Sequence, residues 1–138
     1  MDSPRVSVVT GFHNGGALLR PSLESVLGQS WGDLELIAVD DGSTDGSRAV
    51  VEKIARRDRR VRLIGQDHRG LTSALIRGCR EASGELIARH DSDDLSPPER
   101  LVRQVETLRA DPRLTMVSSW ARAVGPKGET LLEIRRPL

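Results

Sequence analysis

The feature of this 138-residue chain that most constrains its fold is a repeated change in the spacing of its apolar residues. Short runs that favour β-strands alternate with segments in which apolar residues recur at the spacing of a helix. We expect strands at 6–9, 34–39, 61–64, 86–88 and 115–118, and helices around 19–27, 50–55, 71–82 and 101–108. This alternation predicts an α/β fold, with a mostly parallel sheet and helices on both faces.

The pattern weakens after Trp120, where a turn at 125–128 precedes the apolar pair Leu131-Leu132. We therefore expect one further strand or hairpin there. The chain contains no internal repeat and no low-complexity linker, which favours a single domain over 1–138. The lone cysteine, Cys79, lies within the apolar stripe of the third helix and is expected to be a small core residue.

Composition excludes several classes of protein. Lys plus Arg number 21 against 20 for Asp plus Glu, a balance that gives no support to nucleic-acid binding. A single cysteine excludes an internal disulfide and a cysteine-rich zinc site. No apolar stretch approaches the roughly 18 residues of a membrane span, and the N-terminus lacks the apolar segment of a signal peptide. We expect a cytoplasmic location, with membrane association only through partners or missing segments.

A polar turn follows each of the first four predicted strands. Ligands of an open parallel sheet bind beyond the carboxyl ends of its strands, so these turns predict one shared site. No dinucleotide-binding or P-loop glycine pattern is present. The turns are 11–16, 40–43, 67–70 and 90–94.

The fourth turn, Asp91-Ser92-Asp93-Asp94, places three carboxylates within four residues. Such carboxylates repel one another unless a cation or buried donors neutralise them. Mg²⁺ or Mn²⁺ takes one or two carboxylates and completes its coordination with phosphate oxygens and water. The alternative is an acidic cap in front of the helix that starts near Pro98, but its position against a buried strand favours the metal site.

The second turn carries Asp40 and Asp41, whose carboxylates can accept a hydrogen bond from a base N–H or a ribose hydroxyl. The alternative is a turn pair that caps the next helix. His13, in the first turn, suits base stacking, phosphate binding or a plain loop role, and spacing does not choose among them. His68 and His90 are expected to be structural.

Five stretches in the first 120 residues carry a recognisable combination of motifs, with two acidic blocks and a glutamine between the first two strands. Together they resemble the family 2 glycosyltransferases. The acidic block of the fourth turn matches the D-x-D element of that family. The stretches are 6–14, 25–31, 35–45, 84–94 and 98–104.

The resemblance implies a Rossmann-like GT-A nucleotide-binding domain, truncated here to its N-terminal half. It further implies a nucleotide diphosphate sugar, usually UDP-linked, a Mn²⁺ or Mg²⁺ cofactor, and inverting transfer to an acceptor hydroxyl in polysaccharide or glycoconjugate synthesis. The nucleotide-binding residues would be His13, Asn14, Asp40, Asp41, Arg69, Arg77 and Asp91, and the metal ligands Asp91, Asp93 and Asp94.

The general base of that family is an acid in the acceptor-binding half, so we expect it beyond Leu138. After Trp120 the only acids are Glu129 and Glu133. An acceptor glycan or lipid-linked sugar would bind through the missing half, and the exposed edge left behind would favour self-association. The alternative function is a module that binds nucleotide sugar without transferring it. A phosphoacceptor domain fits less well, because it needs acids where His13 and Asn14 stand.

Overall fold

The computed structural model describes residues 5–135. Strands and helices alternate from β1 to the end of α4 at Ala110, and an antiparallel pair of strands follows. The elements are β1 Val6–Phe12, α1 Gly16–Leu27, β2 Leu34–Asp41, α2 Ser47–Ala55, β3 Val61–Gln66, α3 Leu71–Glu81, β4 Leu86–Arg89, α4 Arg100–Ala110, β5 Ala121–Val124 and β6 Thr130–Ile134.

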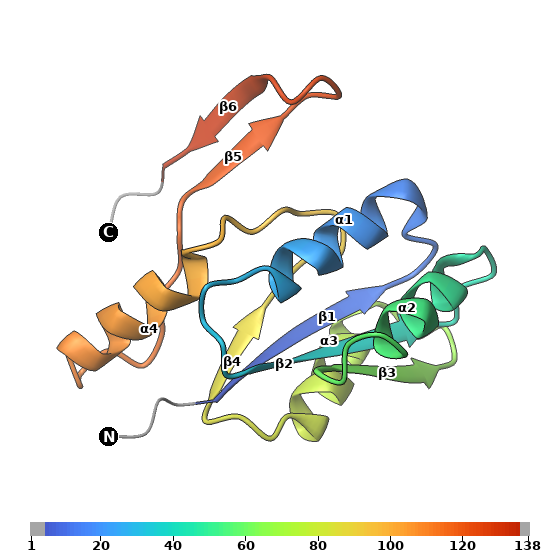
Figure 1. The fold of residues 1–138 in the computed structure, drawn as a ribbon, viewed down its shortest axis with the longest axis horizontal. Helices are drawn as coiled ribbons and strands as arrows, with labels where there is room; N and C mark the ends of the chain where they lie inside the picture. Colours follow the sequence, from blue (N-terminus) through green and yellow to red (C-terminus); the bar gives the residue numbers. More distant parts are fainter. Residues whose placement is uncertain (1–4, 136–138) are drawn as a thin grey trace. The chain divides into compact units, whose positions relative to one another are not determined.

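The first four strands form one parallel sheet in the order β3-β2-β1-β4. Helices α1 and α2 lie on its near face and α3 on its far face (Figure 1). This arrangement follows from right-handed crossovers between neighbouring parallel strands. The expected α/β fold, a mostly parallel sheet with helices on both faces, is confirmed.

One part of the core lies between the two central strands and α3, and α1 and α2 contribute further buried side chains. Every residue of β1 and β2 is buried, as expected for strands covered on both faces. Val9, Ile37 and Val39 pack against Ala74 of α3. Gly78 allows α3 to come this close, because a Cβ at that position would overlap the side chain of Val9.

The chain divides into two compact units, one ending at Glu99 and the other beginning at Arg100. The second unit contains α4 and the β5–β6 hairpin, whose register shifts between Ala123 and Val124. The hairpin confirms the strand or hairpin expected after Trp120. No helix within residues 5–135 combines the length and apolarity needed to cross a bilayer.

Two expectations about local structure are wrong. Residues 115–118 form no strand: Met116 is 81% exposed, and no strand in the described part of the chain pairs with this segment. The apolar run has the composition of a strand, but a strand also needs a partner for its backbone groups. Cys79 is exposed because it follows Gly78, which faces the sheet, and adjacent helical residues point about 100° apart.

Candidate functional site

The carboxyl ends of the four parallel strands carry the loops that the sequence singles out. Because the strands are parallel, these loops emerge at the same end of the sheet. The loops after β1, β2 and β3 are joined to one another by hydrogen bonds. The loop after β4 is instead joined to α1.

Asp41, the last residue of β2, connects the second loop to the third. Its Oδ1 accepts hydrogen bonds from the backbone N–H of Arg69 and from Gln66 Nε2, both at 2.8 Å. Its Oδ2 accepts one from the backbone N–H of Gly70 at 2.9 Å and lies 3.0 Å from Nδ1 of His68. The carboxylate is only 3% exposed and holds the third loop in place.

The pKa of Asp41 is lowered from its ordinary value. Burial alone would raise it, since desolvation disfavours the charged form. The hydrogen bonds from Arg69, Gln66 and Gly70, together with the charge of His68, outweigh that effect. Neighbouring Asp40 is equally buried; it accepts from the Ser43 N–H at 2.9 Å and pairs with Arg48 at 3.4 Å.

Two imidazoles stand side by side next to Asp41. The ring centroids of His13 and His68 are 4.1 Å apart, with a tilt of 34° between the rings. Nδ1 of His13 lies 2.8 Å from the carbonyl oxygen of Asp41, and Nδ1 of His68 lies 3.1 Å from it. Both side chains are exposed. The pair therefore presents two exposed aromatic rings beside the end of β2.

Asn14 connects the first loop to the second. It has a positive φ of 51°, a conformation that asparagine tolerates better than most residues. Its Oδ1 accepts hydrogen bonds from the N–H groups of Thr44 at 2.8 Å and Asp45 at 3.2 Å. Its own N–H donates to Ser43 Oγ at 3.0 Å. In the structure, Asn14 fixes the shape of the loops.

Two polar side chains, Ser25 of α1 and Gln29 just after the helix, hold the segment that follows β4. Ser25 Oγ accepts a hydrogen bond from the N–H of Ser96 at 3.0 Å. Gln29 Nε2 donates to the carbonyl of Pro97 at 2.7 Å and to that of Ser96 at 3.4 Å. Ser25 lies in the last turn of α1, and Gln29 lies two residues beyond the end of the helix. The two side chains therefore hold this segment at the carboxyl-terminal end of α1.

The acidic loop after β4 is open, unlike the second loop. Asp91 is half-buried, whereas Asp93 and Asp94 are exposed. Asp91 Oδ1 forms an ion pair with Arg89 at 2.9 Å. Within residues 5–135, no three His, Cys, Asp or Glu side chains converge to enclose a metal ion. The donor set fits a hard cation held by one or two carboxylates and completed by ligand oxygens and water.

The two arginines of the predicted site are separated along α3. Arg69 lies in the third loop, where its backbone is fixed by Asp41, and its side chain is exposed. Arg77 is also exposed, six residues after Leu71, the first residue of α3. Six residues correspond to about 9 Å along a helix, so Arg77 lies well below the rim of loops.

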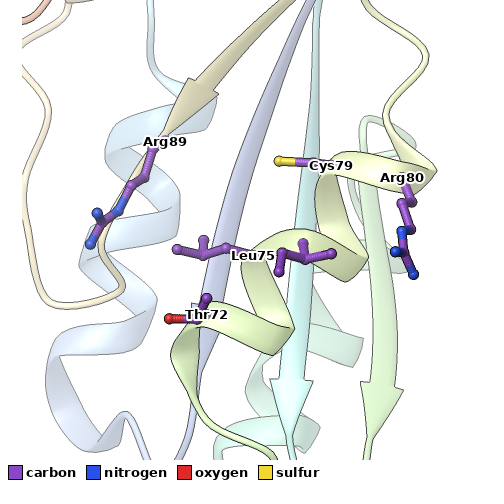
Figure 2. Close-up of a pocket in the computed structure, with 6 residues that line it drawn as sticks. Thr72, Leu75, Cys79, Arg80 and Arg89 are labelled. Carbon is purple, nitrogen blue, oxygen red and sulfur yellow. The ribbon is translucent and has the colours of Figure 1, made fainter.

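A hollow of about 520 Å³ lies beside α3. In Figure 2 the sulfur of Cys79 points from α3 toward β4, and Arg89 rises from the end of β4. None of the predicted nucleotide or metal residues lines the hollow. Its lining consists of Thr72, Leu75, Ile76, Cys79, Arg80 and Arg89.

Sequence reasoning missed Gln66, which donates to Asp41, and the structural importance of Ser25 and Gln29. It also missed Glu35, a buried acid at the amino end of β2. Glu35 Oε1 accepts hydrogen bonds from Ser7 Oγ and from the N–H and Oγ of Ser83, at 2.6–2.8 Å. The one available signal was a charged residue inside an otherwise apolar strand.

Comparison with known proteins agrees with this architecture. A model of glycosyl transferase family 2 matches residues 7–135. EpsH of Bacillus subtilis strain 168, which bears a glycosyltransferase name, is 32% identical over 131 residues. That alignment covers 95% of this chain and 38% of EpsH. The chain thus spans well under half the length of this relative.

Solved structures show the same fold. The mannosyltransferase PcManGT from Pyrobaculum calidifontis, in complex with GDP-Man and Mn²⁺, superposes with a TM-score of 0.75 at 31% identity, over 81% of this chain and 34% of that one. TarS of S. aureus with UDP-GlcNAc gives 0.71 at 24% identity, over 77% and 31%. The fold is that of the GT-A glycosyltransferases, and the chain belongs to glycosyl transferase family 2.

Proposed function

We propose that this chain binds a nucleotide diphosphate sugar, UDP-linked, together with a divalent metal. The protein would use it for inverting transfer to an acceptor hydroxyl of a glycan or lipid-linked sugar. The observation that carries the proposal is the open acidic loop Asp91–Asp94 beside three loops that are fixed to one another. Such a fixed rim suits ligand binding because little conformational entropy is lost on binding.

The base would lie against His13 and His68, whose rings already stand together. Asp41 is the predicted acceptor for a base N–H, yet its Oδ1 already accepts two hydrogen bonds, and its Oδ2 accepts one and lies 3.0 Å from Nδ1 of His68. A contact to the base would replace the side-chain donors Gln66 or His68, because the backbone donors are fixed by the loop. Asp40 and Asn14 would support the loops, and Arg69 would reach the diphosphate more readily than Arg77.

The cation would be held by Asp93, with Asp91 and Asp94 as further ligands. A bound Mn²⁺ or Mg²⁺ supplies positive charge that stabilises the diphosphate as it leaves. Arg89 holds one oxygen of Asp91 and leaves the other available for the metal or for a ribose hydroxyl. The carboxylates of Asp93 and Asp94 are exposed, so a cation could reach them from solvent.

Calorimetry with UDP, in Mn²⁺ and in EDTA, tests this function. We expect tighter binding with Mn²⁺, and Asp93→Ala should lose most of the metal-linked gain. Glu85→Ala is the matched control, because it removes an exposed acid at the opposite end of β4. Titration with GDP tests the choice of base. Equal UDP affinity in Mn²⁺ and EDTA would overturn the metal role.

The second candidate is a module that binds nucleotide sugar without transferring it. It is favoured by the acids of the β5–β6 hairpin, which are engaged locally. Glu129 accepts from the Lys127 N–H at 2.9 Å, and Glu133 pairs with Arg135 at 2.7 Å. Labelled nucleotide sugars and a panel of acceptors separate the candidates. Saturable transfer by the chain would exclude the module and make Glu129 and Glu133 the first residues to replace.

A further inference from the structure

A buried histidine lies directly before the acidic loop. His90 is only 3% exposed, and its backbone N–H donates to the carbonyl of Val9 at 3.0 Å, which continues the pairing of β4 with β1. Its ring lies between two serine hydroxyls. Ser22 Oγ of α1 is 2.8 Å from Nε2, and Ser96 Oγ is 3.2 Å from Nδ1.

Ser22 extends this network to the acidic loop itself. Its hydroxyl, fully buried, donates to the carbonyl oxygen of Asp91 at 3.3 Å. A hydroxyl has one hydrogen, so Ser22 must then accept from Nε2–H of His90. Nδ1 is left to accept from Ser96. His90 thus makes one hydrogen bond to each serine, and Ser22 makes the third, to the Asp91 carbonyl.

The Asp91 carbonyl is the point at which the loop turns. It also accepts the N–H of Asp94 at 3.1 Å, which closes the turn that carries Ser92 and Asp93. The network thus fixes both ends of the acidic loop: Ser22 at Asp91, where the loop leaves β4, and Ser96, where it returns to α1. Buried, fully satisfied networks of this kind hold their members rigidly.

We infer that His90, through Ser22 and Ser96, is a positioning residue that sets the geometry of the Asp91–Asp94 carboxylates and so the strength of cation binding. It touches neither nucleotide nor metal. This role rests on the proposed function, because it requires that the acidic loop binds a divalent cation. Residues behind metal ligands typically contribute about 10–100-fold in metal affinity.

Three substitutions of His90 separate its two hydrogen bonds. In His90→Gln the side-chain amide reaches the place of Nε2 and keeps the bond to Ser22. In His90→Asn the amide takes the place of Nδ1 and keeps the bond to Ser96. His90→Leu keeps neither. The readout is the ratio of UDP affinity in Mn²⁺ to that in EDTA, measured by calorimetry for each variant.

We expect His90→Leu and His90→Asn to reduce this ratio by about tenfold or more, while His90→Gln retains it within about threefold. Affinity in EDTA should change little, because the first three loops do not depend on His90. Ser22→Ala, which removes a single hydroxyl, should also reduce the ratio. It provides a second test if the Leu variant does not fold.

Ser7→Ala is the matched control. It also removes a fully buried serine hydroxyl that makes a hydrogen bond, but at the amino end of β1. It should lower the melting temperature and leave the ratio unchanged. An unaltered ratio in His90→Leu and Ser22→Ala, with a clear metal-linked gain in the unsubstituted chain, would overturn this inference alone. Absence of that gain in the unsubstituted chain would overturn the proposed function as well.

Discussion

Two acidic blocks, Asp40-Asp41 and Asp91–Asp94, lie at the same end of the sheet but differ in burial and in hydrogen bonding. Asp40 and Asp41 are each 3% exposed, and their oxygens accept hydrogen bonds from the chain. Asp93 and Asp94 are exposed. Asp40 and Asp41 are the last two residues of β2, and the acidic loop begins two residues after the end of β4, so both blocks lie at the carboxyl end of a strand.

The difference in burial indicates that the two blocks have different roles. Removing a buried carboxylate that accepts several hydrogen bonds lowers the stability of the fold, because it leaves the donors unpaired. An exposed carboxylate exchanges water for a cation at little structural cost. The second loop thus acts mainly as scaffold, and the fourth presents exposed charge, which under the proposed function would face the ligand. Substitutions at Asp41 and Asp93 test this difference between the two blocks.

The largest effect is expected at Asp41. Asp41→Ala leaves the N–H groups of Arg69 and Gly70 and the amide of Gln66 without their acceptor. Each unpaired buried donor costs about 1–3 kcal/mol, so the loss of the acceptor for three donors should lower the free energy of unfolding by at least about 3 kcal/mol. Urea unfolding followed by circular dichroism measures this. A fall below about 1 kcal/mol would contradict the scaffold role.

The second effect is a loss of folding stability at low pH, which we expect from Glu35. Burial would raise the pKa of Glu35, but hydrogen bonds from Ser7 and Ser83 and the charge of Arg5 lower it from 4.5 to about 2. A lowered pKa stabilises the fold above the unfolded value, and this stability is lost as pH falls from about 4.5 to about 2. The loss is about 3 kcal/mol. Glu35→Gln, which does not titrate, should show a flatter stability profile over this range.

A smaller effect is expected at Gly42, where the second loop meets the third. Its φ of 72° lies in the left-handed region, and a Cβ there would approach the backbone nitrogen of His68 to 2.9 Å. Gly42→Ala should cost about 1–2 kcal/mol for the conformation, with a further loss as the loops separate. Gly32→Ala is the control, because nothing lies within 4 Å of its Cβ position. Thermal unfolding compares the two, and equal melting temperatures would show that this contact is dispensable.

Much of the fold could be predicted because the spacing of apolar residues differs between an element buried on one face and a strand buried on both. The runs at 6–9 and 34–39 became β1 and β2, whose residues are all buried. The failure at 115–118 has the opposite cause. A strand depends on a partner that local spacing does not specify, and this run has none among the described residues.

The sequence predicted at which edge of the sheet the candidate site lies, but not the hydrogen bonds between its residues. The rule that loops meet at the carboxyl ends of parallel strands placed Asp41 and Asp91 at one rim. The bonds that distinguish them join residues far apart in sequence, such as Asp41 with Arg69 and Ser22 with His90. No local pattern encodes such pairs, because each depends on how a loop closes against a neighbouring element.

The smallest effect on stability is expected at Asp93, and it is the sharpest test of the comparison. Its side chain is exposed, and exposed substitutions usually change the free energy of unfolding by no more than about 0.5 kcal/mol. Removing one of several neighbouring negative charges also relieves repulsion, which opposes any loss. Asp93→Ala should therefore unfold at the same urea concentration as the unsubstituted chain. Asp41→Ala, measured in parallel, should not. A destabilisation of Asp93→Ala comparable to that of Asp41→Ala would show that the acidic loop is scaffold too, and the two blocks would no longer differ in role.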